Sequence, residues 1–216
     1  MNQTRFRILV SIIVLASVLS GALLVTAYQK ASRVTPQQLR NDALFVYDDP
    51  ITLNAFSLTK HTGGPFTNTS LQGSWTLAFF GYTFCPDICP ITMAAIKQFY
   101  DLLEASGEGE NVQVVMISVD PERDTEEVLK NYVTYFNPEF IGARGDYSDV
   151  SQLARNVNLT FAYTRVDDEN YLVNHNGEIM VMGPTGDNVG FLKAPYEPQR
   201  MLENFLALKS FSESQR

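Results

Sequence analysis

The hydrophobic positions of the chain fall into short apolar runs separated by segments with helical spacing. Residues 75–80 (Trp-Thr-Leu-Ala-Phe-Phe) form a compact run rich in aromatic side chains, and residues 112–119 form a second run rich in valine. Apolar runs of this length are typical of buried strands. Weaker runs at residues 140–141, 160–166 and 178–182 predict three further strands.

Helical spacing marks the segments between these runs. The apolar residues that recur three or four positions apart between residues 88 and 105 share one helical face: Ile91, Ala94, Ala95, Phe99, Leu102 and Leu103. Further helices are predicted over residues 124–136, 149–156 and 198–208. Asp124 or Thr125 could cap the first of these, because both residue types accept hydrogen bonds from a helix N-terminus.

The order of these elements predicts an α/β fold in which helices flank a central sheet. Cys85 and Cys89 follow the first strong strand and lead into the first long helix. A redox-type cysteine pair at such a junction is the arrangement of thioredoxin-like proteins. We therefore predict a thioredoxin-like fold with a mixed central sheet.

The N-terminus has the pattern of a targeting segment. Residues 8–27 are twenty positions without a charge, between Arg7 and Lys30. A helix of about 20 apolar residues can cross a bilayer, so residues 1–30 are expected to form a transmembrane anchor. Val25-Thr26-Ala27 also fits a small-residue cleavage site, which leaves a cleaved signal segment as the alternative. A single span ahead of an acidic body favours an inner-membrane protein with its folded part on the periplasmic or extracytoplasmic side.

The remaining length accords with one folded domain. The polar segment at residues 31–50 is expected to be a linker. Residues 51–210 are expected to form the thioredoxin-like domain, and residues 211–216 a short tail.

The charge of the chain argues against nucleic acid as a partner. The formal net charge is −8. Residues 1–30 hold three bases and no acid, so the remaining residues carry 13 bases and 24 acids, a net charge of −11. Binding to phosphate backbones depends on surplus lysine and arginine, which this chain lacks. An acidic surface instead attracts cations or basic partners.

Both cysteines of the chain lie in the stretch Gly81-Tyr82-Thr83-Phe84-Cys85-Pro86-Asp87-Ile88-Cys89-Pro90. A structural disulfide, a redox-active pair and half of a metal site are all open on these residues. A disulfide across so short a loop removes little chain entropy and would be a poor staple. A helix N-terminus stabilises thiolate, so at least one of the two cysteines is expected to have a lowered pKa.

A metal site would need a third ligand beyond the two thiolates. Thiolates combined with imidazole select copper or zinc. The chain has two histidines: His61 lies in a polar, turn-like segment, and His175 lies between two predicted strands. The loop at His175 could return to the sheet end where the cysteines lie. The residues alone leave His175 as either a ligand or a hydrogen-bonded surface residue.

Three segments resemble the Sco/SenC family and occur in the family's order. They are the ten-residue cysteine motif, Ile117 to Thr125 (Ile-Ser-Val-Asp-Pro-Glu-Arg-Asp-Thr) and Tyr171 to His175 (Tyr-Leu-Val-Asn-His). A Cys-x3-Cys is a weak signal alone, but this combination is specific and the resemblance covers residues 53–208. It implies a membrane-tethered copper-binding protein whose metal ligands are Cys85, Cys89 and His175, for Cu(I), Cu(II) or both.

The resemblance also implies a function and partners. The protein would deliver copper to the dinuclear copper site of a cytochrome c oxidase subunit, or keep the thiols of that site reduced. Other copper chaperones or thioredoxin-like reductants would be further partners. The alternatives are an extracytoplasmic thiol–disulfide oxidoreductase that uses Cys85 and Cys89 as its catalytic pair, and a redox or copper sensor. Which role dominates is left open by the residues.

Three polar residues are candidates to act on the site from outside the ligand set. Asp87 and Asp120 are the acids nearest the motif. Asp120 ends the second strong strand, at the sheet edge where sites form, and could steady the metal loop, accept a proton or serve only as a turn carboxylate. Asn174 stands where the family usually has aspartate, so the tuning of the His175 imidazole would differ.

Nearby apolar residues have simpler expected roles. Tyr82 and Phe84 are expected to shield the site from solvent. Met180 and Met182 alternate just after His175 and are expected to pack within a strand rather than to bind metal.

Overall fold

The computed structural model describes residues 7, 12–23, 35–41, 43–167 and 171–214, in two separate units. In the first unit, which ends at Thr35, residues 12–23 are helical. Among the described residues, no helix is both long enough and apolar enough to cross a membrane. Residues 8–11 and 24–27 of the uncharged N-terminal stretch lie outside the described residues.

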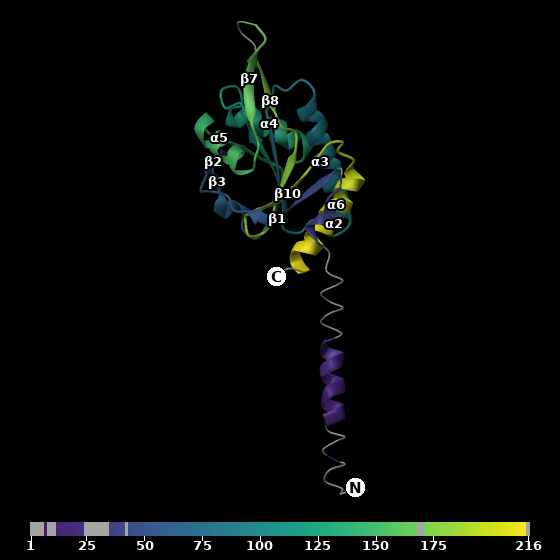
Figure 1. The fold of residues 1–216 in the computed structure, drawn as a ribbon. Helices are drawn as coiled ribbons and strands as arrows, with labels where there is room; N and C mark the ends of the chain where they lie inside the picture. Colours follow the sequence, from purple (N-terminus) through teal and green to yellow (C-terminus); the bar gives the residue numbers. More distant parts are fainter. Residues whose placement is uncertain (1–6, 8–11, 24–34, 42, 168–170, 215–216) are drawn as a thin grey trace. The chain divides into compact units, whose positions relative to one another are not determined.

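The second unit contains an eight-stranded sheet in the order β1-β10-β9-β4-β5-β6-β2-β3 (Figure 1). Its central strands are parallel: β4 (Trp75–Gly81), β5 (Val112–Ser118) and β6 (Ile141–Arg144). The outer strands all join antiparallel: β9 (Ile179–Met182), β10 (Asn188–Leu192), β1 (Leu44–Ile51), β2 (Ser57–Lys60) and β3 (Pro65–Thr67). The prediction of a mixed sheet in an α/β fold is therefore confirmed.

Four long helices accompany the sheet: α3 (Ile88–Ala105), α4 (Glu126–Phe136), α5 (Tyr147–Asn156) and α6 (Pro198–Ser214). Shorter helical segments are α2 (Pro36–Leu39) and η1 (Asn68–Leu71). Helices α3 and α4 link successive parallel strands, and right-handed crossovers place both on one face of the sheet. Helix α6 covers the same face, since it contacts α3 and its Phe205 ring lies 5.7 Å from the rings of both Trp75 and Phe99.

Strand β4 is buried along its whole length. Phe79 and Phe80 point to opposite faces of the sheet, as successive strand residues do, and both have no exposed surface. Both faces of the sheet are therefore covered at β4. The apolar run that predicted this strand reflects burial on two sides.

Several elements differ from the prediction. Strand β1 lies within the segment that the sequence pattern assigns to a linker, and α6 continues past residue 208 through most of the expected tail. Near the end of β1, Asp48, Asp49 and Pro50 are exposed at the edge of the sheet. Edge strands carry charges and proline that discourage further pairing, and these same residues hide a strand from a search for apolar runs.

A two-stranded antiparallel hairpin stands apart from the main sheet. It consists of β7 (Phe161–Arg165) and β8 (Tyr171–His175), with Phe161 opposite His175 (Figure 1). Residues 168–170 between them are outside the described part of the chain. The hairpin matters for function because His175 is the last residue of β8.

Candidate metal centre

The cysteine motif forms the turn between β4 and α3. Gly81 ends β4, and Cys89 lies in the first turn of α3. A Cβ atom at Gly81 would come within 2.6 Å of the Phe79 ring and 3.3 Å of the Cys89 sulfur. The Phe79 ring therefore leaves too little room for a side chain at the first residue of the motif, and the Cys89 sulfur adds to the crowding.

The two cysteines differ in their surroundings. Cys89 is fully buried, whereas Cys85 is partly exposed, and both are free thiols. The Cys89 backbone N–H donates a hydrogen bond to the Cys85 sulfur at 3.4 Å. The Cys85 sulfur therefore takes up one of the unpaired N–H groups at the start of α3.

His175, the last residue of β8 in the hairpin, lies beside Cys89. Its Nε2 lies 3.6 Å from the Cys89 sulfur, and its Nδ1 lies 2.6 Å from the backbone carbonyl oxygen of Asn176. Because a carbonyl oxygen only accepts, the hydrogen-bond network assigns the proton to Nδ1 and leaves a lone pair on Nε2. The rings of Phe79 and Tyr82 contact the imidazole edge-on, with centroids 6.0 and 6.3 Å away.

The third predicted ligand, Cys85, is next to this pair but not joined to it. In the described part of the chain, no three His, Cys, Asp or Glu side chains are grouped closely enough to hold a metal ion. Two sulfurs and an imidazole nitrogen with a free lone pair are nevertheless the donor set that suits a soft metal. Joining all three donors to one ion requires movement of the Cys85 side chain or of the turn at His175.

Burial sets the protonation states of the Cys89–His175 pair. It raises the pKa of the Cys89 thiol and lowers the pKa of His175. For Cys89, a backbone hydrogen bond from Tyr82 opposes the rise but is the smaller effect. The sequence predicts a lowered pKa for at least one of the two cysteines; Cys89 is not such a cysteine, because loss of hydration outweighs the helix dipole.

Asp120 is fully buried at the end of β5 and joins two residues that the sequence analysis did not single out. It accepts hydrogen bonds from Arg123 Nε at 2.5 Å and from the Tyr171 hydroxyl at 2.6 Å. Arg123 also donates to the Tyr171 carbonyl at 3.1 Å, and its guanidinium lies 3.7 Å from the centre of the Tyr171 ring. We call these three residues the Asp120 cluster; it ties the first residue of β8 to the main sheet.

Asp124 ties the cysteine turn to the main sheet, as Asp120 ties the hairpin. It is fully buried and accepts hydrogen bonds from Thr83 Oγ1 at 2.5 Å and Ser118 Oγ at 2.6 Å. Thr83 lies two residues before Cys85, so these bonds fix the turn to β5. Burial raises the pKa of Asp124, while the bonds from Ser118 and Thr83 partly offset the rise. The helix cap is Thr125, whose side chain accepts from Val128 N.

Two candidates for an outer role lie away from the cysteines and His175. Asp87 is exposed and makes no side-chain hydrogen bond that caps α3. Asn174 precedes His175 on a strand and so points to the opposite face; its amide donates to Thr164 Oγ1 at 2.7 Å. Arg123 and Tyr171 are linked to Asp120 by contacts across the fold, and closeness to the cysteine motif in sequence does not reveal such contacts.

The remaining predictions concern apolar residues near the cysteine motif and the second histidine. Tyr82 is buried against the imidazole, as expected, whereas Phe84 is 54% exposed and its shielding role stays a prediction. Met180 and Met182 are buried in β9, which confirms that they pack within a strand. His61 Nδ1 accepts a hydrogen bond from Gly142 N at 2.9 Å and is thereby accounted for in the main sheet.

A mixed sheet with two free cysteines at the junction of its central strand and a helix defines a thioredoxin-like protein. Comparison with known proteins makes the assignment narrower. The SCO1/SenC family model matches residues 47–209, three quarters of the chain. The chain belongs to the SCO1/SenC family.

Individual relatives agree with this assignment. The human protein named "SCO1 homolog, mitochondrial" is 32% identical over 168 residues, which are 77% of this chain but 56% of the human protein. The crystal structure of Arabidopsis thaliana ScoI with copper bound is 33% identical with a TM-score of 0.68, and the match covers 73% of this chain and 97% of that one. The Bradyrhizobium japonicum ScoI structure with copper bound is 31% identical with a TM-score of 0.65, over 74% of this chain and 99% of that one.

Proposed function

We propose that this protein binds copper through Cys85, Cys89 and His175 and delivers it to the dinuclear copper site of cytochrome c oxidase. The observation that carries the proposal is the unprotonated Nε2 of His175, 3.6 Å from the sulfur of a cysteine 86 residues earlier. Two solved relatives that are more than 30% identical hold copper.

The donor set suits copper as a cargo that changes oxidation state. Soft sulfur ligands favour Cu(I), and imidazole also accommodates Cu(II). The buried Cys89 thiol must lose its proton when it binds the metal, so binding releases a proton at this position. His175 needs no such step, because burial keeps it neutral.

Delivery would proceed by ligand exchange with sulfur or nitrogen donors of the recipient. The three ligands come from two differently supported elements: the cysteine turn is bonded to β5, whereas His175 ends a hairpin outside the main sheet. Loss of the imidazole would leave a two-sulfur site that is open to an incoming donor. Oxidation of Cys85 and Cys89 to a disulfide would remove two ligands and so couple metal loading to redox state.

A copper titration tests the ligand set directly. The reduced protein is expected to bind one Cu(II) with a sulfur-to-copper charge-transfer band. The variant His175→Ala is expected to lose that band and to bind Cu(II) more weakly, while His61→Ala serves as the matched control and should behave like the wild type. If His175→Ala keeps the stoichiometry, affinity and spectrum, His175 is not a ligand.

A thiol–disulfide oxidoreductase is the second candidate, favoured by the pairing of a partly exposed Cys85 with a buried Cys89. Cys85 would attack a partner disulfide, and Cys89 would resolve the mixed disulfide. The rate with a peptide disulfide distinguishes the two functions. Fast exchange that His175→Ala leaves unchanged, together with weak copper binding, would favour the oxidoreductase.

The N-terminal segment is proposed to anchor the domain at the inner membrane, with the domain on the periplasmic or extracytoplasmic side. The twenty uncharged positions at residues 8–27 support this location. Membrane fractionation and protease accessibility of the full chain provide the test. Release of a shortened protein into the soluble extracytoplasmic fraction would instead establish a cleaved signal segment.

The delivery role is tested in the source organism. Deletion of the gene is expected to lower the copper content of cytochrome c oxidase under copper limitation, with partial recovery when copper is added. Normal oxidase assembly under copper limitation would exclude the delivery role, even if the purified protein binds copper.

A further inference from the structure

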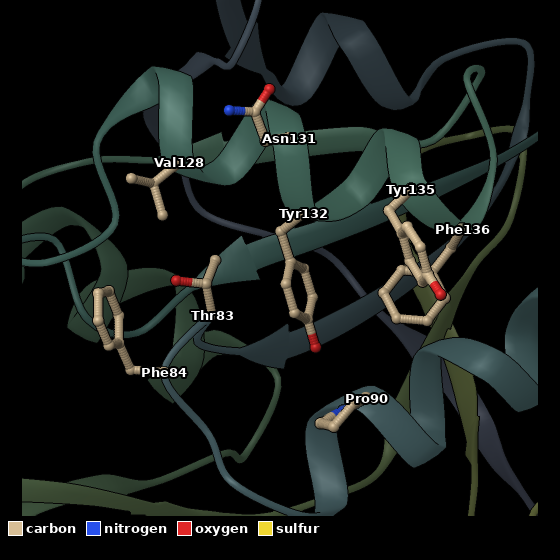
Figure 2. A pocket seen from close by; sticks show the side chains of 8 residues that line it. All are labelled: Thr83, Phe84, Pro90, Val128, Asn131, Tyr132, Tyr135 and Phe136. Carbon is tan, nitrogen blue, oxygen red and sulfur yellow. The ribbon is translucent and has the colours of Figure 1, made fainter.

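A pocket of about 540 Å³ opens directly beside the cysteine turn (Figure 2). Thr83, Phe84 and Pro90 line one side; Phe84 and Pro90 are direct neighbours of Cys85 and Cys89, and Thr83 lies two residues before Cys85. The opposite side is formed by α4, through residues that include Val128, Tyr132 and Tyr135. The pocket is therefore continuous with the proposed copper and thiol site, but none of its lining residues belongs to the ligand set.

One polar atom in this pocket has no partner. The Tyr132 hydroxyl is buried and makes no hydrogen bond to any described residue. Figure 2 shows its ring descending from α4 with the oxygen directed toward Pro90. Burial raises the pKa of Tyr132, and the nearby Cys89 and Cys85 sulfurs add to the rise. A buried donor without an acceptor is costly, and a ligand that supplies an acceptor would remove that cost.

The rim of the pocket is aromatic and exposed. Tyr135 is 83% exposed and Phe84 is 54% exposed, and Ile91 continues the apolar surface along α3 at 58%. Large apolar side chains gathered at one exposed place typically mark an interaction site. The ring of Phe136 packs edge-on against both Tyr132 and Tyr135, at 5.3 Å, which gives the α4 side a fixed shape.

The charge around the pocket selects among apolar ligands. Residues 83–91 and 126–136 contain all its lining residues and hold three acids (Asp87, Glu126 and Glu127) and one base (Lys130), a net charge of −2. All four are exposed. A segment that carries basic residues beside its apolar side chains is therefore favoured over an acidic one.

We propose that this pocket binds the partner protein at an extended, basic and apolar segment next to the partner's sulfur donor. An apolar side chain of the segment enters between Phe84 and Tyr135, and a backbone carbonyl accepts the hydrogen bond of Tyr132. This inference rests on the proposed function, because it names the chemistry that the recipient presents while its sulfur approaches Cys85. It makes Tyr132 a binding residue for the partner rather than for the metal.

Disulfide exchange with short peptides tests the pocket. The probes are the capped peptides Arg-Leu-Cys-Leu, Glu-Leu-Cys-Leu and Gly-Ser-Cys-Gly, each as a mixed disulfide with thionitrobenzoate, reacted with the reduced full chain. The Cys85 thiolate attacks the peptide sulfur, thionitrobenzoate leaves with the electron pair, and its release is measured. We expect the Arg-Leu-Cys-Leu probe to react about 10-fold faster than the Gly-Ser-Cys-Gly probe. Burial of one leucine side chain in the pocket stabilises the reacting complex by enough for a rate difference of this size. The Glu-Leu-Cys-Leu probe should react at an intermediate rate.

Removal of a single hydroxyl group isolates the role of Tyr132. Tyr132→Phe should slow the Arg-Leu-Cys-Leu probe by about 3- to 10-fold, the value of one hydrogen bond, and change the Gly-Ser-Cys-Gly rate by less than about 2-fold. Tyr100→Phe is the matched control, because it removes a hydroxyl that bonds Glu139 and neither residue lines the pocket. It should not change the rate with either probe. If Tyr132→Phe does not fold, the exposed Tyr135→Ser replaces it, with Tyr147→Ser as its control.

Other outcomes would overturn the inference. Equal rates for all three probes, or an equal loss for all three in Tyr132→Phe, would show that the pocket does not select the partner. Concentration-dependent dimerisation of the chain that Tyr135→Ser abolishes would assign the pocket to a second copy. Copper binding is measured in parallel on the same samples: peptide selectivity without copper binding would remove the proposed function and leave the pocket, and copper binding without selectivity would do the reverse.

Discussion

The two halves of the candidate metal centre are supported in different ways. The cysteine turn grows out of the fully buried β4 and is bonded to β5 through Asp124, whose carboxylate accepts from both Thr83 and Ser118. His175 ends a two-stranded hairpin that is tied to the main sheet by the Asp120 cluster at the far end of β8. We call the sulfur half, which is part of the core, the rigid half, and the imidazole half, which lies on a separate hairpin, the hairpin half.

In the proposed function, this difference would divide two tasks. The sulfurs of the rigid half would retain the metal, and the separately supported imidazole would leave it without disturbing the core. Predictions that act on one half and spare the other test this division.

The largest effect is expected from removing a ligand of the rigid half. Cys89→Ser should lower Cu(I) affinity by more than about 100-fold, beyond the range seen when only an outer contact is lost. His175→Ala should lower Cu(I) affinity far less than Cu(II) affinity, because sulfur suffices for the softer ion. Competition with a Cu(I) chelator and titration with Cu(II) measure the two. Equal losses of Cu(I) affinity in both variants would contradict the division.

The next effect is a pH dependence that arises from Cys89. Burial raises the pKa of this thiol, so it is protonated in the metal-free protein and must release its proton on binding. Apparent Cu(I) affinity should therefore rise by at least about 10-fold per pH unit between pH 6.5 and 8.5, one factor of ten for each proton released. In Cys89→Ser, the slope of the logarithm of Cu(I) affinity against pH should fall by one, because one proton fewer is released on binding. A slope that does not change would mean that Cys89 is not deprotonated on binding.

Disruption of the anchor of the rigid half should cost stability. Asp124→Ala leaves the Thr83 and Ser118 hydroxyls without their acceptor in a buried site and should lower the free energy of unfolding by about 2–3 kcal/mol. Urea denaturation of the reduced, metal-free protein measures it. Asp87→Ala, at an exposed acid of the same turn, should change stability by less than about 0.5 kcal/mol. Similar stabilities for the two variants would refute the role of Asp124.

The smallest effect is expected from the support of the hairpin half. Tyr171→Phe removes one hydrogen bond to Asp120 and should lower Cu(II) affinity by about 10-fold, the lower end for contacts that orient a ligand, with about 1 kcal/mol of stability lost. Cu(I) affinity should change by less. Asn174→Ala, at the neighbour of His175 that points the other way, should leave both affinities unchanged. An equal effect of these two substitutions on the Cu(II) spectrum would show that the Asp120 cluster does not position His175.

The sequence predicts the elements of the rigid half well and those of the hairpin half poorly, for a physical reason. Burial on both faces of β4 and β5 concentrates apolar residues in sequence, and the helical stripe that follows reports the packing of α3. The outer strands β1, β2 and β3 are half-exposed or short, and Asn188 and Gly190 interrupt the apolar residues of β10, so none of them leaves a comparable run. Local patterns thus locate the cysteines at the correct junction of strand and helix.

Contacts between distant segments are not encoded in such patterns. The approach of His175 to Cys89, and the bonds from Tyr171 and Arg123 to Asp120, depend on how the hairpin lies against the sheet. Asp124 was considered only as a helix cap, because its neighbours in sequence suggest one, whereas its partners Thr83 and Ser118 come from other elements. The prediction that His175 is a ligand rests on the family resemblance rather than on any pattern in the chain.

The distance in sequence between the cysteine turn and His175 has a consequence for biogenesis. Chains emerge N-terminus first, and contacts between distant segments form late in folding. Both thiols are therefore synthesised and brought to the end of β4 while the histidine that completes the centre is still unfolded or unmade. During that interval the pair can be oxidised but cannot be fully metallated. Newly made protein should need a reductant before it needs copper, and its maturation should fail first in cells where the system that would reduce these thiols is impaired.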